Sequence, residues 1–244
     1  MVNRLSTAFF PPHKLSQAIE SLAFIGNCIV CGHRSLRDID ICQACEDDLP
    51  WSQHQCQRCA LPTPTDTKMC GQCILSPPTF HYALSVWVYA APVAQLISAF
   101  KYQHCYSYGK VLAKIAAKTI ASTHLHKPDL LIATPLHWWR HLRRGFNQSD
   151  YICNYWSQTL NIPIYRGIQR IKATPAQQSL HLQQRRRNIS GAFRMKPSGT
   201  LNGQTVAIVD DVLTTGATAN ELSRCLLQAG ASKVYLWCLA RTPR

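Results

Sequence analysis

Residues 205–221 read TVAIVDDVLTTGATANE, and this stretch decides the fold. Val206 to Val209 form a short apolar run of the kind that a parallel strand buried on both faces needs. Asp210 and Asp211 follow where that strand is predicted to end, and residues 214–218, here called the phosphate loop, open a predicted helix. This order predicts an α/β fold with a ligand site at the carboxyl end of a strand.

The chemistry of the stretch favours a sugar phosphate. A helix start leaves backbone N–H groups unpaired and carries partial positive charge, so it suits a phosphate. Gly216 allows a close approach of the backbone, and the threonine hydroxyls add donors. The loop has no lysine, unlike a Walker loop, so a single phosphate monoester fits better than a triphosphate. Two carboxylates are acceptors for the two donors of a vicinal diol, and phosphate plus diol describes ribose 5-phosphate.

The same stretch closely resembles the 5-phosphoribosyl 1-diphosphate (PRPP) signature of type I phosphoribosyltransferases. The resemblance implies that the carboxylates of Asp210 and Asp211 hold the ribose hydroxyls and help to organise Mg²⁺, and that the phosphate loop holds the 5-phosphate. The alternative is a strand–turn–helix with incidental acids. The PRPP-binding residues implied are Asp210, Asp211, Val212, Thr214, Thr215, Gly216, Ala217 and Thr218.

Eight of the twelve cysteines form four CxxC pairs, with ten residues between each pair and the next. That regularity predicts structural zinc, because two CxxC pairs can supply four thiolates to one tetrahedral ion. Eight ligands imply two zinc ions, with either sequential or interleaved pairing of the motifs. Disulfides or redox-active cysteines are the alternative. The predicted ligands are Cys28, Cys31, Cys42, Cys45, Cys56, Cys59, Cys70 and Cys73.

Charge divides the chain. The formal net charge is +14, but residues 1–80 sum to −1 and residues 81–244 to +15. Two zinc ions, each bound by four thiolates, would take the net charge of the zinc-binding part to about −5. This favours a structural or docking role for that part over electrostatic binding of nucleic acid. We therefore expect an N-terminal arm or short helix over 1–25, a double zinc ribbon over 26–78 and a second domain over 80–244.

Neither a membrane span nor a signal peptide is evident, so we expect a cytoplasmic protein without membrane insertion. Strand and helix patterns alternate in the second domain, which predicts a mainly parallel sheet flanked by helices. The predicted strands are 82–89, 130–133 and 234–239, together with the one before the acidic pair, and the predicted helices are 94–100, 111–120, 148–160 and the one after the phosphate loop.

Residues 140–196 hold eleven Lys/Arg against one acid. Phosphoribosyl transfer releases pyrophosphate from an oxocarbenium-like transition state, so cations and a closing loop are required. By resemblance to type I phosphoribosyltransferases, 134–148 matches the pyrophosphate loop and 170–188 the mobile loop. Arg143 and Arg144 are the predicted catalytic cations, with Lys172 or Arg185 as further candidates. A solvated basic surface is the alternative.

The full layout resembles the ComF/GntX family, phosphoribosyltransferase-like proteins with an N-terminal double zinc ribbon. The matching motifs are the four CxxC pairs, AFKY at 99–102, RRGFNQS at 143–149, TPAQQSL at 174–180, RRRNISGAF at 185–193 and the PRPP motif. The resemblance implies handling of imported single-stranded DNA during natural competence, with other competence or DNA-processing proteins as partners through the zinc module.

Three functions stay open at this point. The first is an enzyme that uses PRPP and Mg²⁺ to transfer ribose 5-phosphate to an acceptor for which no purine or pyrimidine signal is evident. The second is a single-stranded DNA-binding protein, since Trp138, Trp139 and Phe146 lie beside cations and single-strand binders combine stacking rings with a cationic groove. The third is a PRPP sensor without catalysis.

Overall fold

The computed structural model describes residues 26–123, 127–137, 142, 145–172, 189–197 and 200–243. The chain divides into two compact units, Met1–Asp48 and Leu49–Arg244. The described part of the first unit is a short turn-rich segment that ends in helix α2 (Gln43–Asp47). None of the helices in the described ranges combines the length and apolar content that crossing a bilayer requires.

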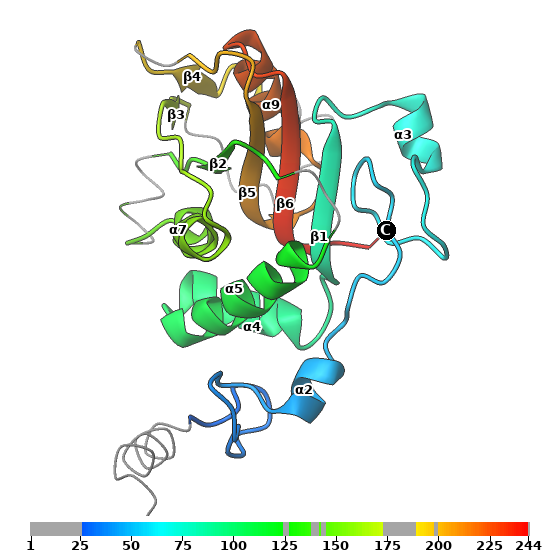
Figure 1. Ribbon diagram of the computed structural model, residues 1–244, viewed down its shortest axis with the longest axis vertical. Helices are drawn as coiled ribbons and strands as arrows, with labels where there is room; N and C mark the ends of the chain where they lie inside the picture. The colour runs from blue at the N-terminus through cyan, green and yellow to red at the C-terminus, as the bar shows by residue number, and fades with distance from the viewer. Residues whose placement is uncertain are drawn as a thin grey trace, which may run out of the picture. The chain divides into compact units, whose positions relative to one another are not determined.

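The core of the second unit is a four-stranded parallel sheet in the order β1-β6-β5-β2 (Figure 1). Its strands are β1 (Tyr82–Val88), β2 (Leu130–Ala133), β5 (Thr205–Leu213) and β6 (Lys233–Arg241). The centres of β5 and β6 are continuously apolar and buried, as expected for parallel strands covered on both faces. The predicted fold class, a mainly parallel sheet flanked by helices, is confirmed.

Helices cover both faces of this sheet. On one face lie α4 (Val93–Tyr102), α5 (Tyr106–Ala121) and α7 (Gln148–Leu160); the indole of Trp156 in α7 is fully buried and donates a hydrogen bond to the Ala113 carbonyl of α5 at 3.0 Å. On the other face, α9 (Ala217–Gln228) buries Leu222 and Leu226 in a cluster with alternate residues of β5 and β6. Figure 1 shows α9 partly hidden behind the strands, α7 to their left, and α4 and α5 below them.

The observed elements follow the predicted order, but several bounds differ: α5, for example, begins at Tyr106, whereas the predicted helix begins at residue 111. Strand β5 does not end before the acidic pair: its register with β6 continues to Leu213, opposite Arg241. The sequence also missed β3 (Ile168–Arg170) and β4 (Phe193–Met195), an antiparallel pair. Each has only three residues, too few for a period-two pattern to register.

Residues 50–57, which lead into the third CxxC motif, lie along the outer edge of β1. The backbone of Ala83 donates to the Gln57 carbonyl at 3.0 Å. The side-chain amide of Gln55 takes the place of a strand backbone, accepting from Ser85 N–H at 3.0 Å and donating to the Ser85 carbonyl at 3.1 Å. These contacts cover an edge that would otherwise expose unpaired backbone groups. The division between the units thus falls between the two predicted zinc sites, and the proposed module boundaries at 26–78 stay a prediction.

Among the described residues of the second unit, a further short helix, α3 (Gly71–Leu75), carries the last cysteine of the fourth CxxC pair. Its outer side exposes Ile74 and Leu75. The packed contacts of residues 50–60 with β1 make the second zinc-binding segment part of the same compact unit as the parallel sheet.

Candidate functional site

The acidic pair lies near the end of β5, where α4 and α7 reach it. Asp211 is buried, and its carboxylate Oδ1 lies 2.9 Å from the ammonium Nζ of Lys101 on α4. The same oxygen accepts from the backbone N–H of Val212 at 2.6 Å. Lys101 belongs to the AFKY motif, in which the sequence suggested no role for it.

Asp210 is held from α7. Its Oδ1 accepts from the hydroxyl of Ser149 at 3.0 Å and from the backbone N–H of Asp211 at 2.9 Å. Ser149 is thus a second site residue that sequence reasoning missed. Ser149 belongs to the motif RRGFNQS, in which the two arginines are the residues whose chemistry the sequence predicts.

The last three residues of that motif tie the site together. Asn147 caps α7 by accepting from Ser149 N–H at 3.1 Å, and its amide donates to the Thr134 carbonyl after β2 at 3.1 Å. The amide of Gln148 donates to the Lys101 carbonyl at 3.5 Å. Consecutive residues of one motif therefore contact β2, α4 and the acidic pair on β5.

The charges of Asp210, Asp211 and Lys101 influence one another's pKa values. Burial raises the pKa of Asp210 to about 7, and the neighbouring charge of Asp211 adds to the rise, while Lys101 and the Ser149 hydrogen bond oppose it. Burial would lower the pKa of Lys101, but its ion pair with Asp211 outweighs that effect, so the pKa lies above its usual value. A cationic lysine therefore sits on a pair of carboxyls that are difficult to ionise together.

The phosphate loop has the backbone that the sequence predicted. Gly216 stands at the N-cap of α9 with φ of +74°, a left-handed conformation that favours glycine. Having no side chain, Gly216 cannot cap the helix, whose first N–H groups are the type of donors that a phosphate accepts from. Thr214 is exposed, and Thr215 and Thr218 are half-buried.

The predicted cations are placed only in part. Arg143, Arg144 and Arg185, like Trp138 and Trp139, lie outside the described residues. Lys172 follows β3, and its ammonium donates to the Ser190 carbonyl, which precedes β4, at 2.8 Å. The segment predicted as a mobile loop, 170–188, begins in β3 and belongs to the connection between the antiparallel strands β3 and β4, and residues 173–188 lie outside the described residues.

Two further residues between 140 and 196 have partners within the protein. Arg166 forms an ion pair with Asp150 at 2.9 Å and donates to the amide oxygen of Asn154 at 2.7 Å. Phe146 packs against Phe100 and Tyr106, with ring centroids 5.3 and 4.9 Å apart. Phe146 is therefore half-buried in an aromatic cluster, and the more exposed ring of that cluster is Tyr106.

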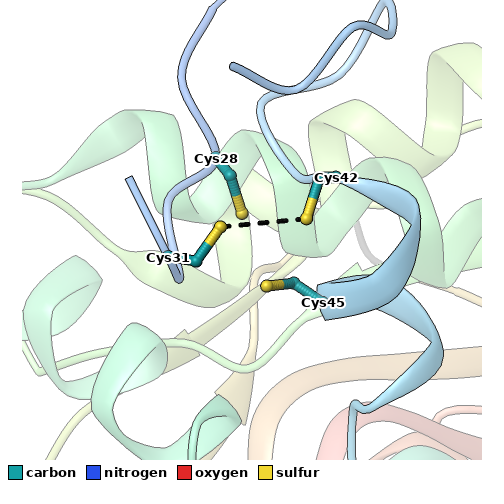
Figure 2. Close-up of side chains that lie close together, drawn as sticks. All are labelled: Cys28, Cys31, Cys42 and Cys45. Carbon is teal, nitrogen blue, oxygen red and sulfur yellow. Dashed lines mark hydrogen bonds between the residues drawn. The ribbon is translucent and has the colours of Figure 1, made fainter. Parts of the chain in front are cut away.

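The cysteines form two separate clusters with sequential pairing. Cys28, Cys31, Cys42 and Cys45 make the first, and Cys56, Cys59, Cys70 and Cys73 the second. In each cluster the ligand atoms lie within 4.8 Å of one another. Figure 2 shows the four sulfurs of the first cluster pointing toward a common centre.

The sulfur spacing fits zinc. The sulfur–sulfur distances are 3.8 Å for Cys31–Cys42, 3.7 Å for Cys59–Cys70 and 4.0 Å for Cys56–Cys73. A tetrahedral ZnS₄ centre with Zn–S of about 2.3 Å requires S–S of about 3.8 Å, whereas a disulfide requires about 2.05 Å. All twelve cysteines are free thiols. The prediction of two structural Cys₄ zinc sites is confirmed, and the interleaved arrangement is wrong.

The chain is similar to a domain family, to curated relatives and to solved structures. The double zinc ribbon domain family matches residues 21–74. The DNA utilization protein YhgH of Escherichia coli O157:H7 is 38% identical over 159 residues, 63% of this chain and 69% of that protein. Competence protein F of Haemophilus influenzae is 37% identical with the same coverage. Among solved structures, adenine phosphoribosyltransferase from Leishmania tarentolae has a TM-score of 0.39 and 11% identity, covering 68% of this chain and 93% of its own.

Proposed function

The chain belongs to the family of the DNA utilization protein YhgH and competence protein F, and we propose that it is a PRPP-binding, phosphoribosyltransferase-like protein that transfers phosphoribosyl groups in the presence of Mg²⁺. The observation that carries the proposal is the order of groups on β5 and α9. Two carboxyls near the end of a parallel strand are followed by a helix start whose N-cap, Gly216, has positive φ and no side chain. A diol and a phosphate monoester are the ligand groups that this order suits.

In this proposal each group has one task. Asp210 and Asp211 accept hydrogen bonds from the two ribose hydroxyls, and the phosphate loop donates backbone and threonine hydrogen bonds to the 5-phosphate. Carboxylate oxygens are also ligands that Mg²⁺ prefers, so the pair fits a role in organising that ion. Mg²⁺ would supply positive charge to the pyrophosphate group as it leaves.

Lys101 and Ser149 extend the predicted set. Ser149 orients the carboxyl of Asp210, and Lys101 neutralises Asp211, which lowers the cost of keeping two adjacent carboxyls beneath the sugar. Arg143 and Arg144 are proposed to stabilise the departing pyrophosphate, because they begin the RRGFNQS motif, whose Ser149 contacts the acidic pair. The bond between the anomeric carbon and a pyrophosphate oxygen would then break, pyrophosphate leaving with the electron pair, while a new bond forms from the anomeric carbon to the acceptor, which loses its proton to solvent.

Calorimetric titration of the zinc-loaded protein with PRPP, with and without Mg²⁺, tests this function. Magnesium-dependent binding supports a phosphoribosyl pocket and justifies a screen of acceptors. Pyrophosphate release with any acceptor supports an enzyme, whereas tight binding without release for every acceptor supports a PRPP sensor. Failure of the folded protein to bind PRPP contradicts the proposal.

A second candidate function is the binding of single-stranded DNA, as the names of the relatives suggest. It is favoured by the charge of +15 on residues 81–244 and by the exposed rings of Tyr102, which follows Lys101, and Tyr106. Stacking rings beside cations are how non-specific single-strand binders work. If about six phosphates are neutralised, log K should fall against log salt with a slope of about −4. An affinity that does not respond to salt contradicts this candidate.

A further inference from the structure

Arg241, the last residue of β6, joins the second zinc site to the segment that leads into the phosphate loop. Its buried guanidinium donates through Nε to the Cys59 carbonyl at 3.1 Å and through Nη1 to the Leu213 carbonyl at 2.9 Å. Nη1 also contacts the carbonyl of Thr214, the first residue of the phosphate loop. One side chain thus bridges a zinc ligand residue and the end of β5.

The same CxxC motif makes a second connection. The guanidinium of Arg58, between Cys56 and Cys59, donates to the Pro78 carbonyl at 2.9 Å and to the His81 carbonyl at 2.8 Å. This fixes the segment that holds Phe80 under Gly216, where a Cβ on the glycine would lie 3.8 Å from the ring. The backbone conformation of residues 56–59 therefore positions both sides of the phosphate loop.

The remaining contacts close the connection on the helix side. The backbone N–H of Thr79 donates to the side-chain oxygen of Asn220, in the first turn of α9, at 2.7 Å. A cavity of about 380 Å³ lies between α3 and the phosphate loop, with Cys59, Cys73, Thr215 and Gly216 in its wall. The loop therefore has hydrogen-bonded contacts to the zinc-binding segment but open space beside it, so its position depends on those contacts.

We propose that metal at the second zinc site holds the phosphate loop in its binding conformation, and that Arg241 is the positioning residue that transmits this effect. Zinc fixes the turn of a CxxC motif, because both cysteines must reach one ion. Without metal the turn at residues 56–59 is free to rearrange, and the Cys59 carbonyl no longer has a defined place beside Arg241. The consequence for PRPP affinity rests on the proposed function, but the coupling itself does not.

Hydrogen–deuterium exchange of the loop, in the full-length protein without PRPP, tests the coupling. We compare Cys70→Ser, which removes a ligand of the second site, with the matched control Cys31→Ser, which removes a ligand of the first. Exchange at residues 213–220 should rise about tenfold in Cys70→Ser, as expected for the loss of one charge-assisted hydrogen bond. It should stay at the wild-type level in Cys31→Ser. Equal exchange in the two variants would overturn the proposal.

The variant Arg241→Lys provides an independent test of the coupling. A lysine keeps the charge but has one ammonium in place of a fork, so it cannot bridge the two carbonyls in the same way. Loop exchange should again rise about tenfold while exchange in the centres of β5 and β6 stays low, and Arg166→Lys serves as a control at an exposed ion pair. Wild-type loop exchange in folded Arg241→Lys would also overturn the proposal.

Should either variant fail to fold, the wild-type protein still decides. Zinc is removed slowly with a chelator, and the extent of alkylation of Cys73 is compared with that of Cys28. Alkylation of Cys73 reports loss of metal from the second zinc site, and alkylation of Cys28 reports loss from the first. Hydrogen exchange in the phosphate loop should rise when Cys73 becomes alkylated and not when Cys28 does. A rise that accompanies alkylation of Cys28 instead rejects the coupling.

PRPP titration then addresses the functional consequence separately. Affinity for PRPP should fall about tenfold in Arg241→Lys relative to Arg166→Lys. If the wild type does not bind PRPP, the proposed function fails while the exchange experiment still tests the coupling. If the wild type binds and Arg241→Lys binds equally well, Arg241 is not a positioning residue for this ligand.

Discussion

The ammonium of Lys101 lies 2.9 Å from the carboxylate of Asp211, although 110 residues separate them in the chain. The two side chains are mostly buried, with 18% and 11% of their surfaces exposed. A cation in this position neutralises one carboxyl of a pair that would otherwise repel each other at the end of β5. We therefore expect Lys101 to matter both for stability and for the ligand that the pair receives.

Replacing Lys101 with methionine should lower the free energy of unfolding by about 3 kcal/mol, because it leaves the Asp211 carboxylate buried without its cation. The double variant Lys101→Met with Asp211→Asn should recover part of that loss. Urea unfolding of the four members of this double-mutant cycle gives the coupling directly. Additive effects would show that the ion pair contributes nothing.

The raised pKa of Asp210 predicts a pH dependence of stability. The pKa of this carboxyl is about 4 in the unfolded chain and about 7 in the folded protein. Between these values the folded state binds more protons, so the contribution of Asp210 to stability falls as pH rises. Urea unfolding at pH 5 and 7.5 should show a smaller fall for Asp210→Asn than for the wild type. The same fall in both proteins would contradict the assignment.

The acidic pair should bind the sugar of PRPP. Asp210→Asn combined with Asp211→Asn removes the charged acceptors and should weaken PRPP affinity about tenfold or more, because hydrogen bonds to charged groups are the stronger ones. Circular dichroism should show a folded protein. Asp129→Asn, at a carboxylate that accepts from Thr205 N–H at the opposite end of β5, is the matched control. Unchanged affinity in the double variant would remove the ribose role.

Metal content tests the two Cys₄ sites. Wild-type protein should contain two zinc ions per chain by elemental analysis, and Cys31→Ser and Cys70→Ser should each contain about one. The reason is that three remaining thiolates bind zinc much more weakly than a complete tetrahedral set. Interdependent sites would instead lose both ions in a single variant.

Gly216 should not tolerate a side chain. At φ of +74° an alanine adopts a left-handed conformation at a cost of roughly 1–2 kcal/mol. Its Cβ would meet only ordinary contacts, so the effect is conformational. Thermal unfolding should show Gly216→Ala less stable than Gly71→Ala, where the added Cβ has no neighbour within 4 Å. Equal stability would mean that the loop adapts.

Local pattern was enough to predict much of this protein. The bounds of β2 and α7, the helix after the phosphate loop and the eight zinc ligands are confirmed, because apolar periodicity and ligand spacing are properties of neighbouring residues. The extent of β5 was not predictable in the same way. A pair of aspartates is a poor strand former, and only pairing with β6 keeps that segment extended.

What the sequence by itself determined about this protein is the chemistry it carries: a strand, two carboxyls, a glycine loop and eight thiolates in metal-binding spacing. Only the tertiary structure decided which residues from distant parts of the chain contact these groups. Lys101, Ser149 and Arg241 are ordinary residues by local pattern, and they become site residues because packing of α4, α7 and β6 brings them to the end of β5. Contacts between residues far apart in the chain leave no periodic signal, since they depend on how the helices pack on the sheet.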